Sequence, residues 1–429
     1  MSKRSSVVAM LTACVVMAAG CSSDSSEGGD STGVTDTSVT IGSHQPLTGP
    51  ASPGFGDVAP AAKAYFDYVN ARGGVHGRKI IYKYRDDAYD PVRTVSVVRQ
   101  LVEQDKVFAI FNGLGTPTHT KVVDYLNARK VPDLLVTSGC TCWDAPEKYP
   151  YTFGFLTDYV REGKILGAYI KKNFPGKRVA YFTQDDQLGQ DGIKGLDKEI
   201  PAASVVSRQV YQPGNLDITP QVAAIDQAKA DVIVAFGIPQ YTAQLRKAQL
   251  KLGNSAQLVL STSSGGEPTT LVRLLQDATP DQSATSLIQG IITDAAAPLP
   301  NETRNPWIQL FTKVRNEYAT SLPLTTAMVA GMTAAYTFVQ ALQVAGPDLT
   351  RQSMVSAMEK GGFTGPSFVP FAFSKTSHAG GTGTRVGSIK GTAIEYQGPP
   401  MTTDNGNGPV VPYDASPATP PANGIPTTR

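Results

Sequence analysis

The chain has 429 residues, of which 41% are hydrophobic and 17% are charged. These proportions are ordinary for a globular protein, and the length exceeds what one hydrophobic core usually organises, so two domains are expected. A formal net charge of +2 gives no electrostatic basis for binding a polyanion, which argues against a nucleic-acid partner.

The N-terminus has the pattern of an export signal. Lys3 and Arg4 precede an apolar run at residues 7–19, and small residues lead into a cysteine. The sequence Ala-Ala-Gly-Cys, which ends at Cys21, resembles the lipobox of bacterial lipoproteins. It predicts that residues 1–20 are a signal peptide and that Cys21 carries lipid, which would anchor the protein to the outer side of the cell membrane.

Two alternatives to this anchor deserve comparison. Leu-Thr-Ala-Cys, which ends at Cys14, is closer to the lipobox consensus, but cleavage there would leave too short an apolar region for export. An ordinary secretory signal without lipid is the second alternative. Residues 21–38 are polar and rich in Gly and Ser, which predicts a flexible tether between the membrane and the folded body.

Apolar runs typical of buried strands then alternate with amphipathic stretches typical of helices. In the first series, residues 39–50 are expected to form a strand that runs into a Pro/Gly loop, further strands are expected at 79–84, 107–111 and 134–136, and helices are expected at 58–69 and after Pro91 and Thr116. In the second series, helices are expected at 160–172, 189–199, 220–228 and 239–252, and strands at 178–182, 204–211, 231–236 and 257–260. Repeated units of this length predict two mainly parallel sheets, each covered by helices on both faces.

The remaining chain is less regular. After a strand at 288–292, helices are expected at 307–319, 326–344 and 351–358, and short strands at 368–373 and 394–396 around a Gly-rich segment. Residues 401–429 are dominated by Pro, Gly, Thr and Asn, which predicts a disordered tail.

Residues 107–120 predict a strand, a glycine-broken loop and a helix start that together form a pocket. Gly113 and Gly115 allow a tight turn, and Thr116 and Thr118 stand where hydroxyls and free backbone N–H groups converge. Such a point suits a carboxylate or another small anion. A plain βα turn with a capping threonine is the alternative, because every α/β unit needs such a turn.

Six motifs follow one another in an order that resembles the branched-chain amino-acid (Leu/Ile/Val) binding proteins of bacterial ABC transporters, in the type I periplasmic-binding-protein superfamily. They are IGSHQPLTGP at 41–50, FDYVNARGGVHGRKI at 66–80, YRDDAYDP at 84–91, GLGTPTHT at 113–120, VTSGCTCW at 136–143 and QLGQDG at 187–192. Each motif is weak alone, but their joint order is fairly specific and spans about residues 39–400.

The resemblance implies an α/β fold of two doubly wound lobes joined by three crossovers. Lobe one would combine residues 39–157 and 295–361, and lobe two would combine 158–294 and 362–400. A solute would be trapped in the cleft between the lobes, at the carboxyl ends of the strands.

The resemblance also implies ligand-binding residues in lobe one. Thr116, preceded by Gly115, falls on the Ser/Thr that hydrogen-bonds the ligand carboxylate, and Gly139 and Thr141 fall on matching positions of the next loop. Phe55 approximates an aromatic residue that covers the ligand, although packing in a surface loop would also explain it.

Lobe two departs from the family pattern. Leu188 replaces an aromatic residue, Ile238 or Gly237 occupies a second aromatic position, and Thr262 stands where an acidic residue would pair with the ligand ammonium. A buried ammonium without a carboxylate partner is costly, so an ordinary α-amino acid is in doubt.

The solute is therefore expected to be an amino acid, an amide or an organic acid. Asp185 or Asp186 would supply a carboxylate from another position, unless these acids only cap the next helix. Tyr241 is a further candidate in lobe two, with packing on a helix face as its alternative.

No cofactor or metal is expected. Cys140 and Cys142 are too few for a structural zinc site. An oxidising compartment permits a disulfide between them, but a disulfide across one residue would close a strained ring, so we interpret them as small buried residues.

These features predict a solute-binding lipoprotein whose partners are a small organic solute and ABC permease subunits. A ligand-sensing subunit for a receptor is an alternative that uses the same closing lobes. An enzyme is another, but the common hydrolase and nucleotide motifs are missing, and His44 and His119 would be its acid/base pair.

Overall fold

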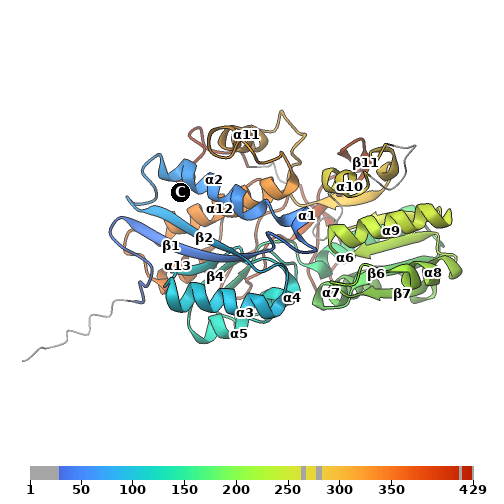
Figure 1. Ribbon diagram of the computed structural model, residues 1–429, viewed down its shortest axis with the longest axis horizontal. Helices are drawn as coiled ribbons and strands as arrows, with labels where there is room; N and C mark the ends of the chain where they lie inside the picture. Colours follow the sequence, from blue (N-terminus) through green and yellow to red (C-terminus); the bar gives the residue numbers. More distant parts are fainter. Residues whose placement is uncertain (1–28, 262–266, 277–282, 415–417, 428–429) are drawn as a thin grey trace, which may run out of the picture.

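The computed structural model describes residues 29–261, 267–276, 283–414 and 418–427. Two β-sheets lie side by side in Figure 1, each covered by helices. We call the half built on the five-stranded sheet the first lobe and the half built on the nine-stranded sheet the second lobe. The predicted signal peptide and Cys21 lie outside the described residues.

The sheet of the first lobe is parallel throughout, with strand order β2-β1-β3-β4-β5. Its strands are β1 (Ser38–Gln45), β2 (Lys79–Asp86), β3 (Ala109–Phe111), β4 (Asp133–Val136) and β5 (Thr152–Gly154). The helices between them are α1 (Ser52–Phe55), α2 (Val58–Asn70), α3 (Pro91–Arg99), α4 (Thr116–His119) and α5 (Val123–Ala128), with a π-helical turn at Gln100–Gln104 and a 3₁₀ turn at Thr141–Trp143. Every residue of β3 and β4 is buried, as expected for parallel strands covered on both faces.

The second sheet has the order β14-β13-β11-β10-β9-β8-β6-β7, and β12 pairs with β11. Its parallel strands are β6 (Val179–Gln184), β7 (Val205–Tyr211), β8 (Val232–Phe236), β9 (Gln257–Leu260) and β10 (Ile292–Ala295). Its antiparallel strands are β11 (Gly383–Lys390), β12 (Ala393–Tyr396), β13 (Met401–Thr402) and β14 (Val411–Pro412). The helices are α6 (Tyr159–Asn173), α7 (Gln187–Glu199), α8 (Thr219–Gln227), α9 (Pro239–Leu252) and α10 (Pro268–Leu274), with 3₁₀ turns at Ala202–Ser204 and Ser286–Ile288.

Three late helices return to the first lobe: α11 (Pro306–Tyr318), α12 (Thr326–Ala345) and α13 (Arg351–Lys360). Both α11 and α12 pack on α2, which brings orange and blue segments together in Figure 1. Within residues 39–400, the chain thus crosses between the lobes after β5, after β10 and after α13, which confirms the two-lobed fold with three crossovers expected for this part.

Helix α12 is the central core helix of the first lobe. By length and apolar composition it would suffice to cross a membrane, but 78% of its most apolar window is buried inside the protein. Tyr336 on this helix makes ring contacts with Tyr65 of α2 and Trp307 of α11. Burial of such large aromatic side chains accounts for the return of the late helices to the first lobe.

Of the two strands predicted around the Gly-rich segment, the one at 394–396 is confirmed by β12, and the one at 368–373 is wrong, because these residues form no strand. Strand β11 instead begins inside the Gly-rich segment. A Cβ at Gly383 would lie 2.1 Å from the carbonyl oxygen of Met401, and one at Gly387 would lie 2.6 Å from that of Glu395. The glycines therefore allow neighbouring strands to approach closely, which composition alone does not reveal.

The expectation of a disordered tail also differs from the structure. Strands β13 and β14 extend the second sheet, and the buried Lys164 ammonium donates hydrogen bonds to the Asp404 carboxylate and to the carbonyls of Gly406 and Gly408. The chain then crosses a fourth time, and the carbonyl of Gly424 accepts a hydrogen bond from Tyr65 in the first lobe. Tertiary hydrogen bonds, which composition does not encode, order this segment.

Candidate functional site

The lobes meet over the carboxyl end of the first sheet. Thr116 begins α4, and its hydroxyl lies 2.7 Å from that of Ser138, after β4, and 3.4 Å from that of Tyr159, at the start of α6. Gly115 has φ +107°, and a Cβ there would lie 2.5 Å from the Thr118 hydroxyl. The predicted pocket loop thus turns through a conformation that favours glycine and presents Thr116 toward the second lobe.

A narrow pocket of about 20 Å³ lies at this point, and it includes residues from both lobes. Five of the predicted ligand-binding residues line it: Phe55, Gly115, Thr116, Leu188 and Ile238. The buried Tyr89 and Tyr159 also line the pocket, and neither was predicted from the sequence. Burial raises the pKa of Tyr159 to about 12, so its hydroxyl remains a neutral hydrogen-bonding group at ordinary pH.

The donors predicted to hold a ligand carboxylate on the next loop already hold a carboxylate of the protein. The backbone N–H and hydroxyl of Thr141 donate to Asp191 Oδ2 of α7, at 2.8 and 2.9 Å. Asp191 Oδ1 accepts from the Gln187 side chain, so this acid is buried and hydrogen-bonded through both oxygens. Thr141 therefore links the two lobes in the present arrangement.

A disulfide joins Cys140 and Cys142, the residues on either side of Thr141. The interpretation of these cysteines as unpaired buried residues is therefore wrong. Bond formation across one residue is compatible with their Cα–Cα distance of 5.1 Å, which lies within the usual range.

Three further predicted residues lie outside the narrow pocket. Gly139 packs under Tyr159 and accepts a hydrogen bond from its backbone N–H, and Asp186 caps α7 by accepting from the N–H of Leu188. Tyr241 is fully buried in the second lobe, where its ring stacks on Tyr211 and its hydroxyl accepts from a backbone N–H. Thr262 lies outside the described residues.

His44 and His119 do meet, but in the interior of the first lobe. The nitrogen atoms that face each other, Nε2 of His44 and Nδ1 of His119, are 2.9 Å apart, and the outer nitrogens contact Asp87 and Asp133 at 2.8 Å. All four side chains have no exposed surface, and burial lowers the pKa of His44. Because the pair lines neither interlobe pocket, the structure gives the acid/base hypothesis no contact with a solute.

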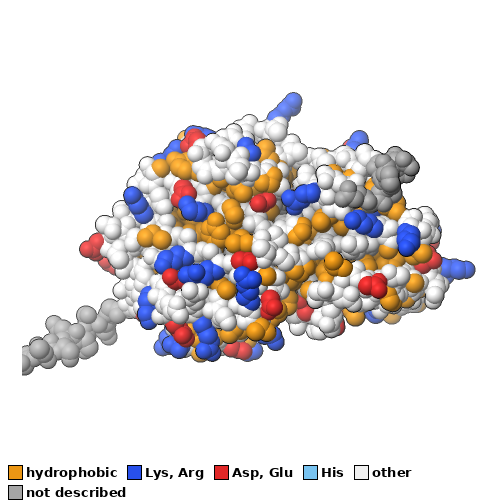
Figure 2. Space-filling view, viewed as in Figure 1, with side chains coloured by type: hydrophobic (Ala, Val, Ile, Leu, Met, Phe, Trp, Pro, Cys, Tyr) orange, Lys and Arg blue, Asp and Glu red, His pale blue; other side chains and the backbone are white. Residues whose placement is uncertain are grey.

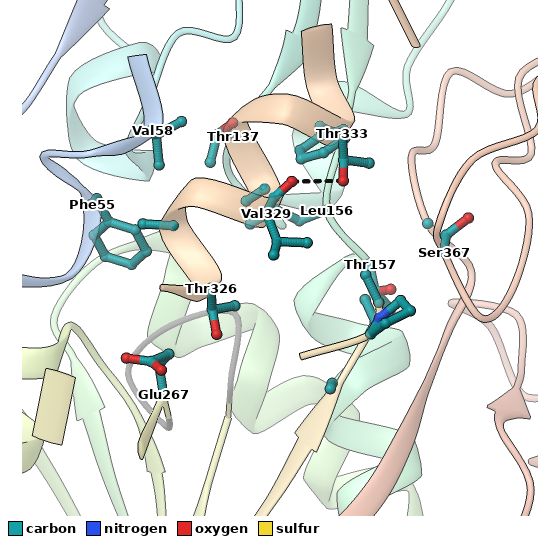
Figure 3. A pocket seen from close by; sticks show the side chains of 18 of the residues that line it. Phe55, Val58, Thr137, Leu156, Thr157, Glu267, Thr326, Val329, Thr333 and Ser367 are labelled. Atoms are coloured by element: carbon teal, nitrogen blue, oxygen red, sulfur yellow. Dashed lines mark hydrogen bonds between the residues drawn. The ribbon is translucent and has the colours of Figure 1, made fainter. Parts of the chain in front are cut away.

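A larger cavity of about 130 Å³ lies beside the narrow pocket and shares Phe55, Thr137 and Leu156 with it. Figure 3 shows Phe55 and Val58 on one side of this cavity and Thr157 and Ser367 on the other. Its wall combines α1, the start of α12 and all three crossovers. Sequence reading missed this cavity because the wall joins residues more than 200 positions apart, whose apolar side chains are indistinguishable from core.

The polar atoms around the larger cavity are mostly engaged by the protein itself. Thr157 donates to the Gly383 carbonyl, Thr333 donates to the Val329 carbonyl as Figure 3 shows, and Glu267 accepts from backbone N–H groups of α10. The Thr326 hydroxyl oxygen is buried and has no hydrogen-bond partner among the described residues. It is a buried polar group available to a molecule in the cavity.

The described residues contain no group of three or more His, Cys, Asp or Glu side chains placed to hold a metal ion. On the face shown in Figure 2, basic and acidic side chains are interspersed over both lobes. This face therefore has no single-sign field of the kind that attracts a polyanion.

A family model described as periplasmic binding protein matches residues 38–393. The Leu/Ile/Val-binding protein homolog 3 of Brucella melitensis is 30% identical over 237 residues, which cover 53% of this chain and 61% of that relative. The chain thus aligns with about three fifths of the length of this curated relative.

Solved structures share the fold. A branched-chain amino-acid ABC transporter protein from Thermus thermophilus with bound valine has a TM-score of 0.74 at 21% identity, covering 87% of this chain and 98% of that one. A fatty acid ABC transporter substrate-binding protein from Thermomonospora curvata has a TM-score of 0.75 at 22% identity, covering 89% and 96%.

Proposed function

Because the chain belongs to the periplasmic binding protein family, we propose that it is the extracytoplasmic solute-binding lipoprotein of an ABC importer. It captures an amino acid or a related small organic solute between its lobes and delivers it to the permease subunits. The observation that carries this proposal is a pair of pockets walled by both lobes, beside the crossovers about which such lobes close.

The contacts between the lobes support a trap that opens and closes. Tyr89 of the first lobe accepts a hydrogen bond from Gln184 of the second, and Arg273 donates to the carbonyl of Pro53. A Cβ at Gly54 would lie 2.3 Å from Pro239 Cγ, so α1 rests directly on the start of α9. Polar and van der Waals contacts of this kind can break and re-form, and relative motion is the usual behaviour of two domains joined in this way.

The descriptions of similar proteins name solutes of more than one chemical class. The curated relatives include Leu/Ile/Val-binding proteins, and the two structural neighbours are described with valine and with fatty acid transport. All of these solutes combine an apolar body with a small polar end. We therefore place this chain's solute among small organic molecules that have an apolar portion.

The binding function is tested by a thermal-shift and calorimetry screen of the mature chain against amino acids, amides, organic acids and neutral apolar compounds. We expect at least one class to raise the melting temperature and to bind with 1:1 stoichiometry. Absence of stabilisation by every class, together with turnover of one compound, would contradict the proposal and favour an enzyme.

The lipid anchor is tested separately by feeding cells an alkyne-labelled fatty acid and fractionating their membranes. The Cys21→Ser variant should lose both the lipid label and membrane attachment, whereas its matched control Cys14→Ser should keep both. The reverse result would place the lipobox at Cys14, and retention of label by both variants would rule out either cysteine as the lipidated residue.

A further inference from the structure

The two interlobe pockets differ in what they can hold. A volume of 20 Å³ is enough for about one water molecule, whereas an apolar cavity of about 150 Å³ in another protein admits benzene. The larger cavity, at 130 Å³, is therefore the one that accommodates an organic molecule in the present arrangement of the lobes. Its size corresponds to a ring or branched chain of about six non-hydrogen atoms.

The wall of this cavity is poorly suited to an ion. Glu267 is the only charged residue among the described residues that line it, and its carboxylate already accepts from the N-terminal N–H groups of α10. Among the described residues of the lining, a solute carboxylate would find no lysine, arginine or histidine, and an ammonium would find one carboxylate that is already engaged. Transfer of either ion from water without a matching partner is unfavourable, because the ion loses its hydration.

The apolar part of the wall comes from both lobes and from the crossovers. Val58 and Val329 belong to the first lobe, Pro239 belongs to the second, and Val369 and Phe371 belong to the crossover after α13. A molecule in this cavity would remove apolar surface of both lobes from water. Its binding would therefore favour the closed arrangement, in proportion to the apolar surface that is buried.

The Thr326 hydroxyl offers a directional contact to a solute. The Thr326 hydroxyl has no partner among the described residues, and Thr326 opens α12, so its O–H can donate to an oxygen of the solute. Thr325 already caps the N–H of Met328, which leaves the Thr326 hydroxyl without a role in the helix. In Figure 3 Thr326 and Glu267 lie at the same end of the cavity, where a negative group on the solute would face the glutamate.

The donors predicted for an amino-acid carboxylate point to the same conclusion. The Thr116 hydroxyl is hydrogen-bonded to the Ser138 hydroxyl, and the backbone N–H and hydroxyl of Thr141 both donate hydrogen bonds to Asp191. An α-amino acid bound there would have to displace a buried carboxylate that accepts three hydrogen bonds. The larger cavity requires no such exchange.

We propose that this larger cavity is the solute site and that its solute is an uncharged, predominantly apolar molecule whose single oxygen accepts a hydrogen bond from Thr326. The inference rests on the proposed binding function and narrows it to one site and one chemical class. It moves the solute away from the Thr116 loop toward the crossovers and α12.

The test uses four small probes of similar size. Cyclohexanone is neutral with one acceptor, toluene is neutral without one, cyclohexanecarboxylate is an anion and cyclohexylamine is a cation. L-Leucine is added as the zwitterion that the family resemblance suggests. Calorimetry on the full mature chain should show cyclohexanone binding at least tenfold more tightly than the two ions and L-leucine.

Two variants locate the site. Ala330→Leu replaces a methyl group on α12 that lines the cavity with a larger isobutyl group, and it should weaken cyclohexanone binding at least tenfold. The matched control Ala345→Leu, at the other end of the same helix, should leave this binding unchanged. Thr326→Val removes the hydroxyl at nearly constant shape and should weaken cyclohexanone about tenfold while leaving toluene binding unchanged. Thermal melts of each variant without probe verify that it is folded.

Two results would overturn the inference. The first is tighter binding of L-leucine or of an ionised probe that Ala330→Leu leaves unaffected, which would keep the proposed binding function and return the site to the Thr116 loop. The second is failure of both neutral probes, after which the broad solute screen alone decides the function.

Discussion

Asp191 offers the sharpest test of how the lobes are held together, because its carboxylate joins α7 of the second lobe to the loop after β4 in the first. Thr141 contributes two hydrogen bonds across the boundary, at 2.8 and 2.9 Å, to a side chain that is 2% exposed. Hydrogen bonds to a charged group contribute about 1.5–3 kcal/mol each. Even at the lower end, losing both in Asp191→Ala changes the closed-to-open ratio by ~3 kcal/mol, or roughly 100-fold.

Spin labels measure this change directly. Val92 on α3 and Leu252 on α9 are 80% and 49% exposed and belong to different lobes, so cysteines there report the interlobe distance by double electron–electron resonance. We expect Asp191→Ala to shift the solute-free chain toward longer distances, and Asp191→Asn to shift it less because one acceptor oxygen survives.

The matched control is Asp197→Ala on the same helix. Among the described residues, the Asp197 carboxylate accepts hydrogen bonds from the side chains of Tyr181 and Arg208, which both belong to the second lobe. If Asp191→Ala gives the same distance distribution as the parent and the control, the Thr141 contact does not hold the lobes together. The reasoning from hydrogen-bond geometry to closure would then be refuted.

Three further predictions concern stability and local order. Gly113→Ala would place a Cβ 2.6 Å from His44 Nε2 and 2.8 Å from His119 Nδ1, so urea unfolding should show a loss of ~1–3 kcal/mol, against little change for Gly365→Ala, whose Cβ meets nothing within 4 Å. Burial lowers the pKa of His378, although Glu359 and Asp144 oppose that shift. The folded state therefore binds fewer protons than the unfolded state below pH ~6.5, and stability should fall there by up to ~1.4 kcal/mol per pH unit. His378→Gln should flatten this slope in unfolding experiments between pH 7.5 and 5.5, and an unchanged slope would assign it to other groups. Lys164→Met removes the ammonium that binds residues 404–408, so hydrogen exchange there should accelerate at least tenfold, whereas Lys194→Met, at an exposed position of α7, should leave it unchanged.

Sequence patterns predicted the parts of this protein that depend on local periodicity. Strands such as β3 and β4 are continuous apolar runs because both of their faces are covered, and the order of six motifs indicated the two lobes. The Gly-rich β11 escaped because glycine there reflects close approach of Met401 and Glu395, which are partners that only the folded sheet defines.

The candidate site also has one part that the sequence predicts and one part that it does not. Thr116, Leu188 and Ile238 lie in loops that follow strands, so topology brings them together in the narrow pocket. The larger cavity depends on α12, whose apolar residues have the pattern of an ordinary core helix. No sequence pattern indicates that the Thr326 hydroxyl lacks a partner, because that depends on which groups the fold places around it.

The C-terminal segment limits how far the two lobes can move apart. Tyr413 is fixed to the second lobe by a backbone hydrogen bond to Pro400, and the carbonyl of Ala418 accepts from Trp307 of the first lobe. At ~3.6 Å per residue, the chain between Tyr413 and Ala418 can span at most ~18 Å. Tyr413 and Ala418 therefore have a maximum separation. An opening of the lobes that exceeds it must first break the hydrogen bond that holds Tyr413 or the one that holds Ala418.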